Sequence, residues 1–193
     1  ACAISGGIPG LANLANREKV FKTVYLDNPS TVNPEKTLPK TTSKIKEGEL
    51  SLPEFYNTVK SLSQVVDVDY YLPGCPPPTE LIINAMNLIF EGKLPAKGFV
   101  LAPLKSVCDE CPLEKTEKKI KKLKRIYEIE KIDPSKCLLE QGILCMGPAT
   151  RGGCNARCIH ANMPCTGCGG PTPNSLDQGA KMMSALASVL GIE

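Results

Sequence analysis

The chain has 193 residues, a net charge of +3 and only 5% aromatic residues, with no tryptophan. This length allows one large domain or two small ones. No segment approaches the run of about 20 apolar residues that a membrane-spanning helix needs, and the first residues lack the pattern of a signal peptide. We therefore expect a cytoplasmic protein without membrane association, in which clustered cysteines stay reduced.

The N-terminal third of the chain carries few signals of regular structure. A cysteine among glycines and a proline predicts a glycine-rich loop over residues 2–10. Residues 11–26 have only weak helical character. Residues 27–50 are rich in proline and lysine without periodicity, which predicts a long surface insertion.

Residues 65–72 (VVDVDYYL) are the best strand candidate, because they are rich in β-branched and aromatic side chains and end at Pro73 and Gly74. An apolar segment with helical spacing follows over residues 79–92, so the order strand, turn, helix predicts an α/β unit. Cys75 lies in the turn, at the strand's carboxyl end, where ligands bind in open sheets. Amide dipoles at this position favour a thiolate.

Two further helices are expected toward the C-terminus. The first covers residues 115–127, and its basic run predicts a solvated helix face; a docking surface for an acidic partner is the alternative. No aromatic side chains interleave the basic ones, so we expect no nucleic-acid partner. The second helix reaches Leu190, with Asn174 or Ser175 as its cap and Gly191 as its stop signal.

Eight of the ten cysteines form two sets of four between Cys108 and Cys168. Each set contains a C-x-x-C pair, which lets two thiolates from one turn reach the same metal centre. Abundant glycine near the second set lets the backbone approach inorganic sulfide. We interpret the sets as ligands of two iron–sulfur clusters; structural zinc, also satisfied by four cysteines, is the alternative. The first quartet is Cys108, Cys111, Cys137 and Cys145, and the second quartet is Cys154, Cys158, Cys165 and Cys168.

Cys2 and Cys75 are two further thiols in glycine-rich or proline-rich turns. Two ligands do not complete a cluster, so from the residues alone they are either partial ligands or unrelated buried cysteines. His160 is the only histidine, and we interpret it as a polar loop residue because four thiols already complete the neighbouring site. No pattern for nucleophilic, acid–base or phosphate-binding chemistry is present, so we expect no bond-making site.

Six short motifs mark the chain from residue 74 onward: Gly74-Cys-Pro-Pro77, Cys108-Asp-Glu-Cys-Pro112, Cys137-Leu-Leu-Glu-Gln-Gly142, Cys145-Met-Gly-Pro-Ala-Thr-Arg-Gly-Gly-Cys154, Asn162-Met-Pro-Cys-x-x-Cys168 and Leu176-Asp-Gln-Gly-Ala-Lys181. Together they resemble the small subunit of cytoplasmic nickel–iron hydrogenases. The likeness is greatest to the coenzyme F420-non-reducing (methyl viologen-reducing) type of methanogens. A subunit of respiratory complex I shares the first motif but lacks the cysteine-rich tail.

The resemblance implies three iron–sulfur clusters in a row. It implies Cys2 and Cys75 as ligands of the proximal 4Fe–4S cluster, the second quartet as ligands of the medial one, and the first quartet as ligands of the distal one. Related hydrogenases have a histidine in place of Cys108, which again argues against His160 as a ligand. Some also have proline in the medial site, where Cys158 here implies a full 4Fe–4S cluster.

The resemblance also implies a fold and a division into domains. The fold is α/β, with the C-terminal part of a flavodoxin-like doubly wound sheet in residues 1–100, on the proximal-cluster side. A loop-rich, iron–sulfur-cluster-binding domain follows in residues 101–193. In the family, an early C-x-x-C in the flavodoxin-like half supplies the other two proximal ligands. Either further N-terminal residues or another polypeptide is therefore expected to supply them here.

By the same resemblance the chain is an electron-transfer subunit. It would relay electrons from hydrogen oxidation in a separate nickel–iron large subunit to an iron–sulfur adaptor subunit and heterodisulfide reductase. Alternatives within the class are the gamma subunit of a coenzyme F420-reducing hydrogenase and the small subunit of a sulfhydrogenase or NAD-linked enzyme. An alternative of another class is a zinc-stabilised interaction module.

Overall fold

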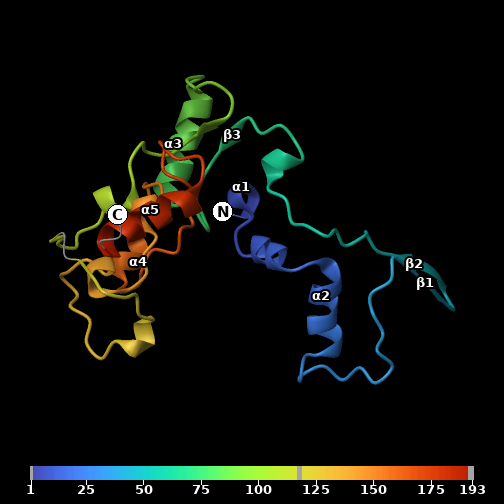
Figure 1. Cartoon of the computed structure of the whole chain (residues 1–193). Helices are drawn as coiled ribbons and strands as arrows, with labels where there is room; N and C mark the ends of the chain where they lie inside the picture. The colour runs from blue at the N-terminus through green and yellow to red at the C-terminus, as the bar shows by residue number, and fades with distance from the viewer. Residues whose placement is uncertain (1, 117–118, 191–193) are drawn as a thin grey trace. The chain divides into compact units, whose positions relative to one another are not determined.

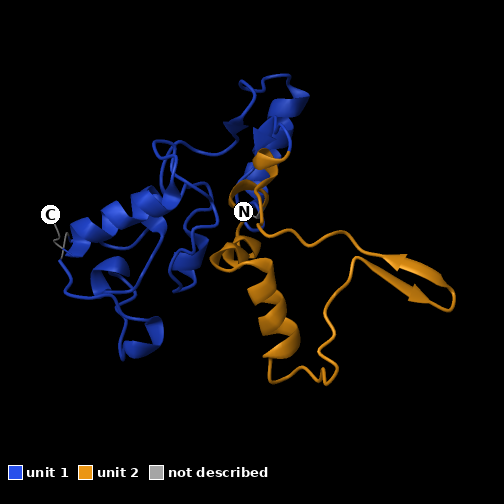
Figure 2. Cartoon of the chain, turned by 45° about the vertical axis from the view of Figure 1, so that its right-hand side comes forward, with its two compact units in different colours: residues 1, 66–193 blue, residues 2–65 orange. Residues whose placement is uncertain are grey.

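The structure, a computed structural model, describes residues 2–116 and 119–190, with the side chain of Cys2 left out. The chain divides into two compact units, Cys2–Val65 and Val66–Glu193, which Figure 2 colours separately. Each unit combines short helices with a two-stranded sheet. The predicted α/β composition is therefore confirmed at the level of mixed helix and strand.

The unit Cys2–Val65 begins with more helix than its sequence predicts. The expected glycine-rich loop starts with helix α1 (Cys2–Ser5), and a glycine turn follows it, in which the Gly10 N–H donates to the Gly6 carbonyl at 3.0 Å. The segment after this turn is helical through most of its length. It contains a 3-10 helix (Pro9–Leu14), α2 (Arg17–Phe21) and a π-helical turn (Lys22–Leu26).

The predicted surface insertion contains an antiparallel hairpin of β1 (Thr42–Ile45) and β2 (Gly48–Ser51). Every residue of both strands is exposed, so the hairpin has no buried face of its own. A 3-10 turn, Leu62–Gln64, follows near the end of the unit. The exposure of both hairpin strands agrees with the expectation of a surface segment.

The unit Val66–Glu193 opens with a short parallel β–α–β arrangement (Figure 1). β3 (Tyr70–Tyr71) pairs with β4 (Phe99–Val100), and α3 (Thr79–Phe90) connects them. The predicted strand–turn–helix unit is therefore confirmed. Its strand is shorter than the predicted residues 65–72, because the ladder extends only as far as the two residues of β4.

Gly74 directs the chain from β3 toward α3. Its φ is +129°, a conformation that residues with a Cβ rarely adopt. A Cβ at this position would lie 2.5 Å from Pro77 Cα, closer than atoms can approach. The turn that carries Cys75 therefore requires glycine before it.

Residues 101–190 are loop-rich, as the sequence predicts. The longer regular elements there are α4 (Arg157–His160) and α5 (Gln178–Leu190) within the described residues. Short 3-10 turns occupy Val107–Asp109, Ile126–Glu128, Leu139–Gln141 and Gly147–Ala149. The buried core of the unit includes two cysteines beside its aliphatic side chains. Its members are Val107, Leu138, Leu139, Ile143, Cys145, Ala149, Ala156, Ile159, Cys165 and Met182.

The helix predicted over residues 115–127 is wrong for the part of that segment that the structure describes; residues 117 and 118 lie outside it. The backbone there bonds to other segments instead. The Ile120 N–H donates to the Val189 carbonyl at 3.0 Å, and the Lys124 N–H donates to the Gly142 carbonyl at 2.7 Å. Lysines three and four positions apart would repel each other on a helix, which weakens the helical alternative.

Helix α5 reaches Leu190 as predicted, but neither predicted cap fills that role. The Asp177 carboxylate accepts a hydrogen bond from the Ala180 N–H at 2.9 Å, the geometry of a helix cap. Ser175 instead donates its hydroxyl to the Asp177 carbonyl at 2.8 Å. Gly191, the predicted stop signal, lies outside the described residues.

Along the chain, the first compact unit ends at Val65, whereas the predicted domain boundary lies near residue 100. The compact units are defined by contacts within this chain alone. The division into residues 1–100 and 101–193 therefore stays a prediction. Each sheet of the described chain has two strands, and the flavodoxin-like sheet stays a prediction as well. None of the helices described in residues 2–116 and 119–190 is both long and apolar enough to span a bilayer.

Candidate metal centres

The first quartet surrounds one small cavity in the unit Val66–Glu193. All four of its cysteines line a cavity of about 20 Å³. The rest of the wall is mostly apolar, with Lys115 as a charged member. The structure thus brings together four thiols that the sequence separates by the long basic segment. The quartet consists of Cys108, Cys111, Cys137 and Cys145.

The surroundings of this cavity favour the neutral form of two of its thiols, those of Cys108 and Cys145. Burial raises the pKa of Cys108 to about 12, and the charge of Lys115 opposes this rise. Burial also raises the pKa of Cys145, against the backbone N–H groups of Gly147 and Cys165. Metal binding at such a site must displace protons, so the metal centre itself supplies the charge that stabilises the thiolates.

Gly147 leaves room beside two of these sulfurs. A Cβ at this position would lie 3.1 Å from Cys108 Sγ and 3.6 Å from Cys145 Sγ. The absence of a side chain lets the backbone pass directly against the thiols, and the Gly147 N–H reaches Cys145. This close approach is what the sequence leads us to expect of glycine near a cluster site.

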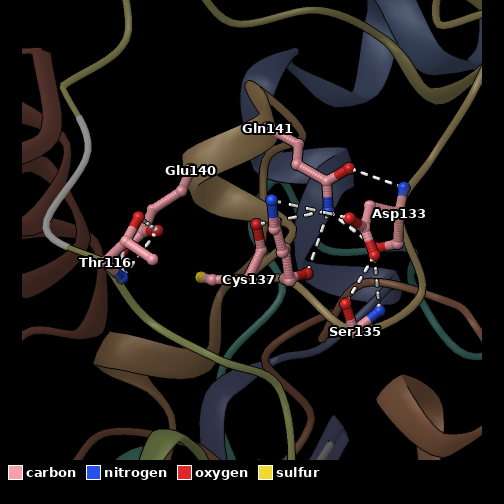
Figure 3. A network of polar contacts seen from close by, with 7 residues as sticks. Thr116, Asp133, Ser135, Cys137, Glu140 and Gln141 are labelled. Atoms are coloured by element: carbon pink, nitrogen blue, oxygen red, sulfur yellow. Dashed lines mark hydrogen bonds and ion pairs between the residues drawn. The ribbon is translucent and has the colours of Figure 1, made fainter.

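A single glutamine organises the loop that carries Cys137 (Figure 3). Gln141 Oε1 accepts from the Asp133 N–H at 2.8 Å, and its Nε2 donates to the carbonyls of Asp133 at 3.0 Å and Lys136 at 2.9 Å. Ser135 closes the turn on the Asp133 carboxylate. Sequence analysis missed Gln141, although its place in the motif that begins at Cys137 was a signal.

The second quartet lines a larger cavity in the same unit. This cavity has a volume of about 190 Å³, and five cysteines border it. Burial raises the pKa of Cys165 to about 11, against hydrogen bonds from the Gly167 N–H and the Thr150 side chain. The five are the second quartet, namely Cys154, Cys158, Cys165 and Cys168, together with Cys75.

Cys75 therefore lies at the edge of the second quartet's cavity, and its side chain is exposed. Burial raises the pKa of Cys168, and the backbone N–H of Cys75 opposes that rise through a hydrogen bond to the sulfur. The side chain of Cys2 lies outside the described part of the structure. The predicted pairing of Cys2 with Cys75 thus stays a prediction.

The two cavities lie next to each other, because hydrogen bonds join residues of the two quartets and one side chain lines both cavities. The Cys165 N–H donates to Cys145 Sγ at 3.3 Å, and the Met146 N–H donates to the Cys165 carbonyl at 2.9 Å. Ile159 lines both cavities. The quartets are therefore adjacent, joined by hydrogen bonds of backbone N–H groups and by Ile159, which contributes to both cavity walls.

The side chain of Glu110 joins the C-x-x-C segment of the first quartet to the segment around Cys154. Its side chain is only 7% exposed, and its carboxylate accepts from the Gly153 N–H at 2.7 Å and the Asn155 N–H at 2.8 Å. Lys105 Nζ lies 3.3 Å away as its ionic partner. The carboxylate thus holds the backbone on both sides of Cys154. Sequence analysis missed this residue, because nothing local distinguishes it from a surface glutamate.

His160 ends α4 and is exposed. It borders a surface hollow that Cys154 also lines, together with Glu80 and Arg157, which form an ion pair at 2.9 Å. It does not line either cysteine cavity within the described residues. Its position agrees with the interpretation of a polar surface residue.

The donor set fits iron–sulfur clusters. Thiols of the two quartets border cavities with largely apolar walls, and one cavity is far larger than a single zinc ion with sulfurs about 2.3 Å away would require. In the described residues, no three His, Cys, Asp or Glu side chains converge closely enough to hold one metal ion directly. Thiols spread around a cavity suit a cluster, whose own iron and sulfide atoms fill the space between its ligands.

Comparison with known proteins identifies the relatives of this chain. The family model described as NADH ubiquinone oxidoreductase, 20 Kd subunit, matches residues 1–89. The whole chain is 43% identical to the F420-non-reducing hydrogenase iron-sulfur subunit of Archaeoglobus profundus and covers 61% of it. It is also 37% identical, over its full length, to the corresponding F420-non-reducing hydrogenase subunit of Methanothermobacter thermautotrophicus, covering 58% of that protein. Against the F420-non-reducing hydrogenase vhu subunit of Methanocaldococcus jannaschii, 97% of the chain aligns with 59% of the relative at 39% identity.

These matches and the cysteine cavities first define a class, the cysteine-rich subunits of oxidoreductases. Within that class, the chain belongs to the family of F420-non-reducing hydrogenase subunits, since it covers 68% of the subunit from Methanothermus fervidus at 46% identity. The chain spans about three fifths of the length of the other three curated relatives.

Proposed function

We propose that this chain is the electron-transfer subunit of a nickel–iron hydrogenase complex and that its cysteines hold 4Fe–4S clusters. The observation that supports this most directly is the sorting of eight cysteines into two cavities, each lined by one complete quartet. A cluster bound in each cavity would accept and release one electron at a time. Membership of a hydrogenase subunit family gives independent support.

The order of the cysteines supports a linear arrangement. Cys75 borders the second quartet's cavity, and the backbone N–H of Cys165, in the second quartet, donates a hydrogen bond to the sulfur of Cys145, in the first. We therefore assign Cys75, together with Cys2 and ligands outside this sequence, to a proximal site. The second quartet is the medial site and the first quartet is the distal site.

The chain's own contribution is to hold the thiolates and set their environment. Burial of Cys108, Cys145 and Cys165 disfavours their charged forms, while backbone N–H groups aimed at the sulfurs favour them. The balance of these two effects sets how readily a bound centre accepts an electron. Hydrogen splitting itself belongs, in this proposal, to a separate subunit.

The proposal implies partners at the two ends of the relay. A nickel–iron large subunit would lie next to the Cys75 end, where that cysteine is exposed. An electron acceptor would lie next to the first quartet. For the F420-non-reducing type, this acceptor is an iron–sulfur adaptor subunit leading to heterodisulfide reductase, in the cytoplasm.

Substitution of Cys165 by serine tests the assignment. In the anaerobically purified complex, Cys165→Ser should remove one cluster's EPR signal and about four iron atoms, and it should slow methyl viologen reduction. Thr166→Ser, at the exposed neighbouring position, should change neither. Unchanged iron content and activity in Cys165→Ser would overturn the medial assignment.

A further inference from the structure

One buried hydroxyl lines the second quartet's cavity and belongs to neither ligand set. Thr150 is 1% exposed, lines the second quartet's cavity, and lies in the motif that joins Cys145 to Cys154. Its backbone is fixed, because its carbonyl accepts from the Val107 N–H at 2.8 Å. A polar side chain in such a buried place needs hydrogen-bond partners, and their identity shows its role.

The Thr150 hydroxyl has three polar neighbours and one proton. Gln178 Nε2 donates to its oxygen at 3.1 Å, so the oxygen accepts on that side. The hydroxyl donates to the Met146 carbonyl at 2.6 Å. Thr150 also lines the same cavity as Cys165, and its side chain opposes the rise in the Cys165 pKa through a hydrogen bond to that sulfur. A hydroxyl rotates about its C–O bond, so the proton can point to either acceptor.

Gln178 holds this arrangement from the first residue of α5. Its Nε2 also donates to the Gly167 carbonyl at 3.0 Å, which ties α5 to the loop between Cys165 and Cys168. Both N–H bonds of the amide group are thereby used as donors. Gln178 cannot take the hydroxyl proton through this nitrogen, so Thr150 keeps that proton for Met146 or Cys165.

The carbonyl of Met146 does not depend on the hydroxyl. It also accepts from the Ala149 N–H at 3.1 Å. Rotation of the Thr150 hydroxyl toward Cys165 would therefore leave no buried carbonyl without a partner. A thiolate sulfur, being charged, is a stronger acceptor than a thiol, so the cluster-bound form of Cys165 is the one that would attract the proton.

We propose that Thr150, held by Gln178, is a positioning residue that donates its hydroxyl proton to the Cys165 thiolate and raises the reduction potential of the cluster bound there. The proposal rests on the proposed function, because it requires a cluster in the second quartet. A hydrogen bond to a ligand sulfur stabilises the more negative, reduced state, and loss of that bond lowers the potential.

Redox titration followed by EPR tests this in the complete complex, purified anaerobically. The relevant signal is the one that Cys165→Ser removes. Thr150→Val replaces the hydroxyl with a methyl group of similar size, and it should shift the midpoint potential of that signal to a more negative value. Thr150→Ser, which restores the hydroxyl, should return the potential to that of the unaltered protein. Gln178→Leu should also shift the midpoint potential to a more negative value, because the Gln178 amide no longer donates to the Thr150 hydroxyl oxygen.

Thr172 provides a matched control. It is the other buried threonine of the described residues, at 7% exposed, and it does not line the second quartet's cavity. Thr172→Val should therefore leave the potential unchanged. An unchanged potential in Thr150→Val at full iron content would overturn the proposal; if that variant loses its iron, an unchanged potential in Gln178→Leu would overturn it. Absence of any iron–sulfur signal in the unaltered protein would overturn the proposed function instead.

Discussion

The backbone N–H of Cys165 donates a hydrogen bond to the sulfur of Cys145 across 3.3 Å, and both cysteines are buried, at 8% and 7% exposed. Cys165 belongs to the second quartet, and Cys145 belongs to the first quartet. One peptide unit therefore joins the two proposed cluster sites.

Gly147→Ala should impair the first quartet's site. The added methyl group would lie 3.1 Å from Cys108 Sγ, so the sulfur or the backbone must move. We expect about four iron atoms per chain to be lost or weakly held, measured by iron analysis after anaerobic gel filtration. Gly10→Ala is the control, because its added methyl group meets nothing closer than 4.0 Å. Equal iron retention in both variants would contradict the proposed crowding.

Glu110→Ala should destabilise the unit Val66–Glu193. The buried carboxylate accepts two backbone N–H bonds and pairs with Lys105, so its loss should cost on the order of 2 to 3 kcal/mol. The measurement is the urea midpoint of the protein under anaerobic conditions.

Glu80→Ala is the matched control for Glu110. Glu80 also forms an ion pair, with Arg157, but its side chain is 70% exposed, and such pairs contribute less than about 1 kcal/mol. A Glu110→Ala midpoint no lower than that of Glu80→Ala would show that the buried carboxylate does not hold the loop of Cys154.

Gln141→Leu should release the loop that carries Cys137 and lower the occupancy of the first quartet alone. The glutamine amide makes hydrogen bonds on both sides of the turn, and leucine makes none. EPR spectra should then lose the signal of the first quartet's cluster and keep that of the second. Gln64→Leu, in the unit Cys2–Val65, removes a comparable local contact to Ser61 and should leave both signals. Loss of both signals in Gln141→Leu would contradict a local role.

The basic segment should guide an acidic electron acceptor to the first quartet. Lys115 lines that quartet's cavity, and Lys121 and Lys122 are exposed nearby in the sequence. With an acidic ferredoxin as acceptor, Lys121→Glu/Lys122→Glu should raise its KM roughly tenfold and weaken the salt dependence of the rate. Methyl viologen reduction should not change. Lys44→Glu/Lys46→Glu, in the exposed hairpin region, is the control; equal effects in both double variants would contradict the assignment.

The features with local signals were predictable from the sequence. The C-x-x-C pairs and their spacing led to two quartets, and the structure gathers each quartet around one cavity. Helix α3 followed from the periodicity of its apolar residues. The C-x-x-C pairs and the apolar periodicity of α3 both involve residues close together in the chain, where spacing has direct geometric meaning.

The features that depend on distant contacts were not predictable. Glu110 owes its role to backbone groups more than 40 positions away, and nothing in its own neighbourhood marks it. The basic segment resembles a helix in sequence, but its backbone partners near Val189 and Gly142 hold it in another conformation. Tertiary hydrogen bonds override local propensity at both places.

The central claim is that the two quartets hold iron–sulfur clusters. Metal and acid-labile sulfide analysis of the anaerobically purified chain tests it most directly. The claim predicts about eight iron atoms and about eight sulfides per chain from the two quartets, with little zinc. About two zinc ions per chain, with neither iron nor acid-labile sulfide, would contradict it.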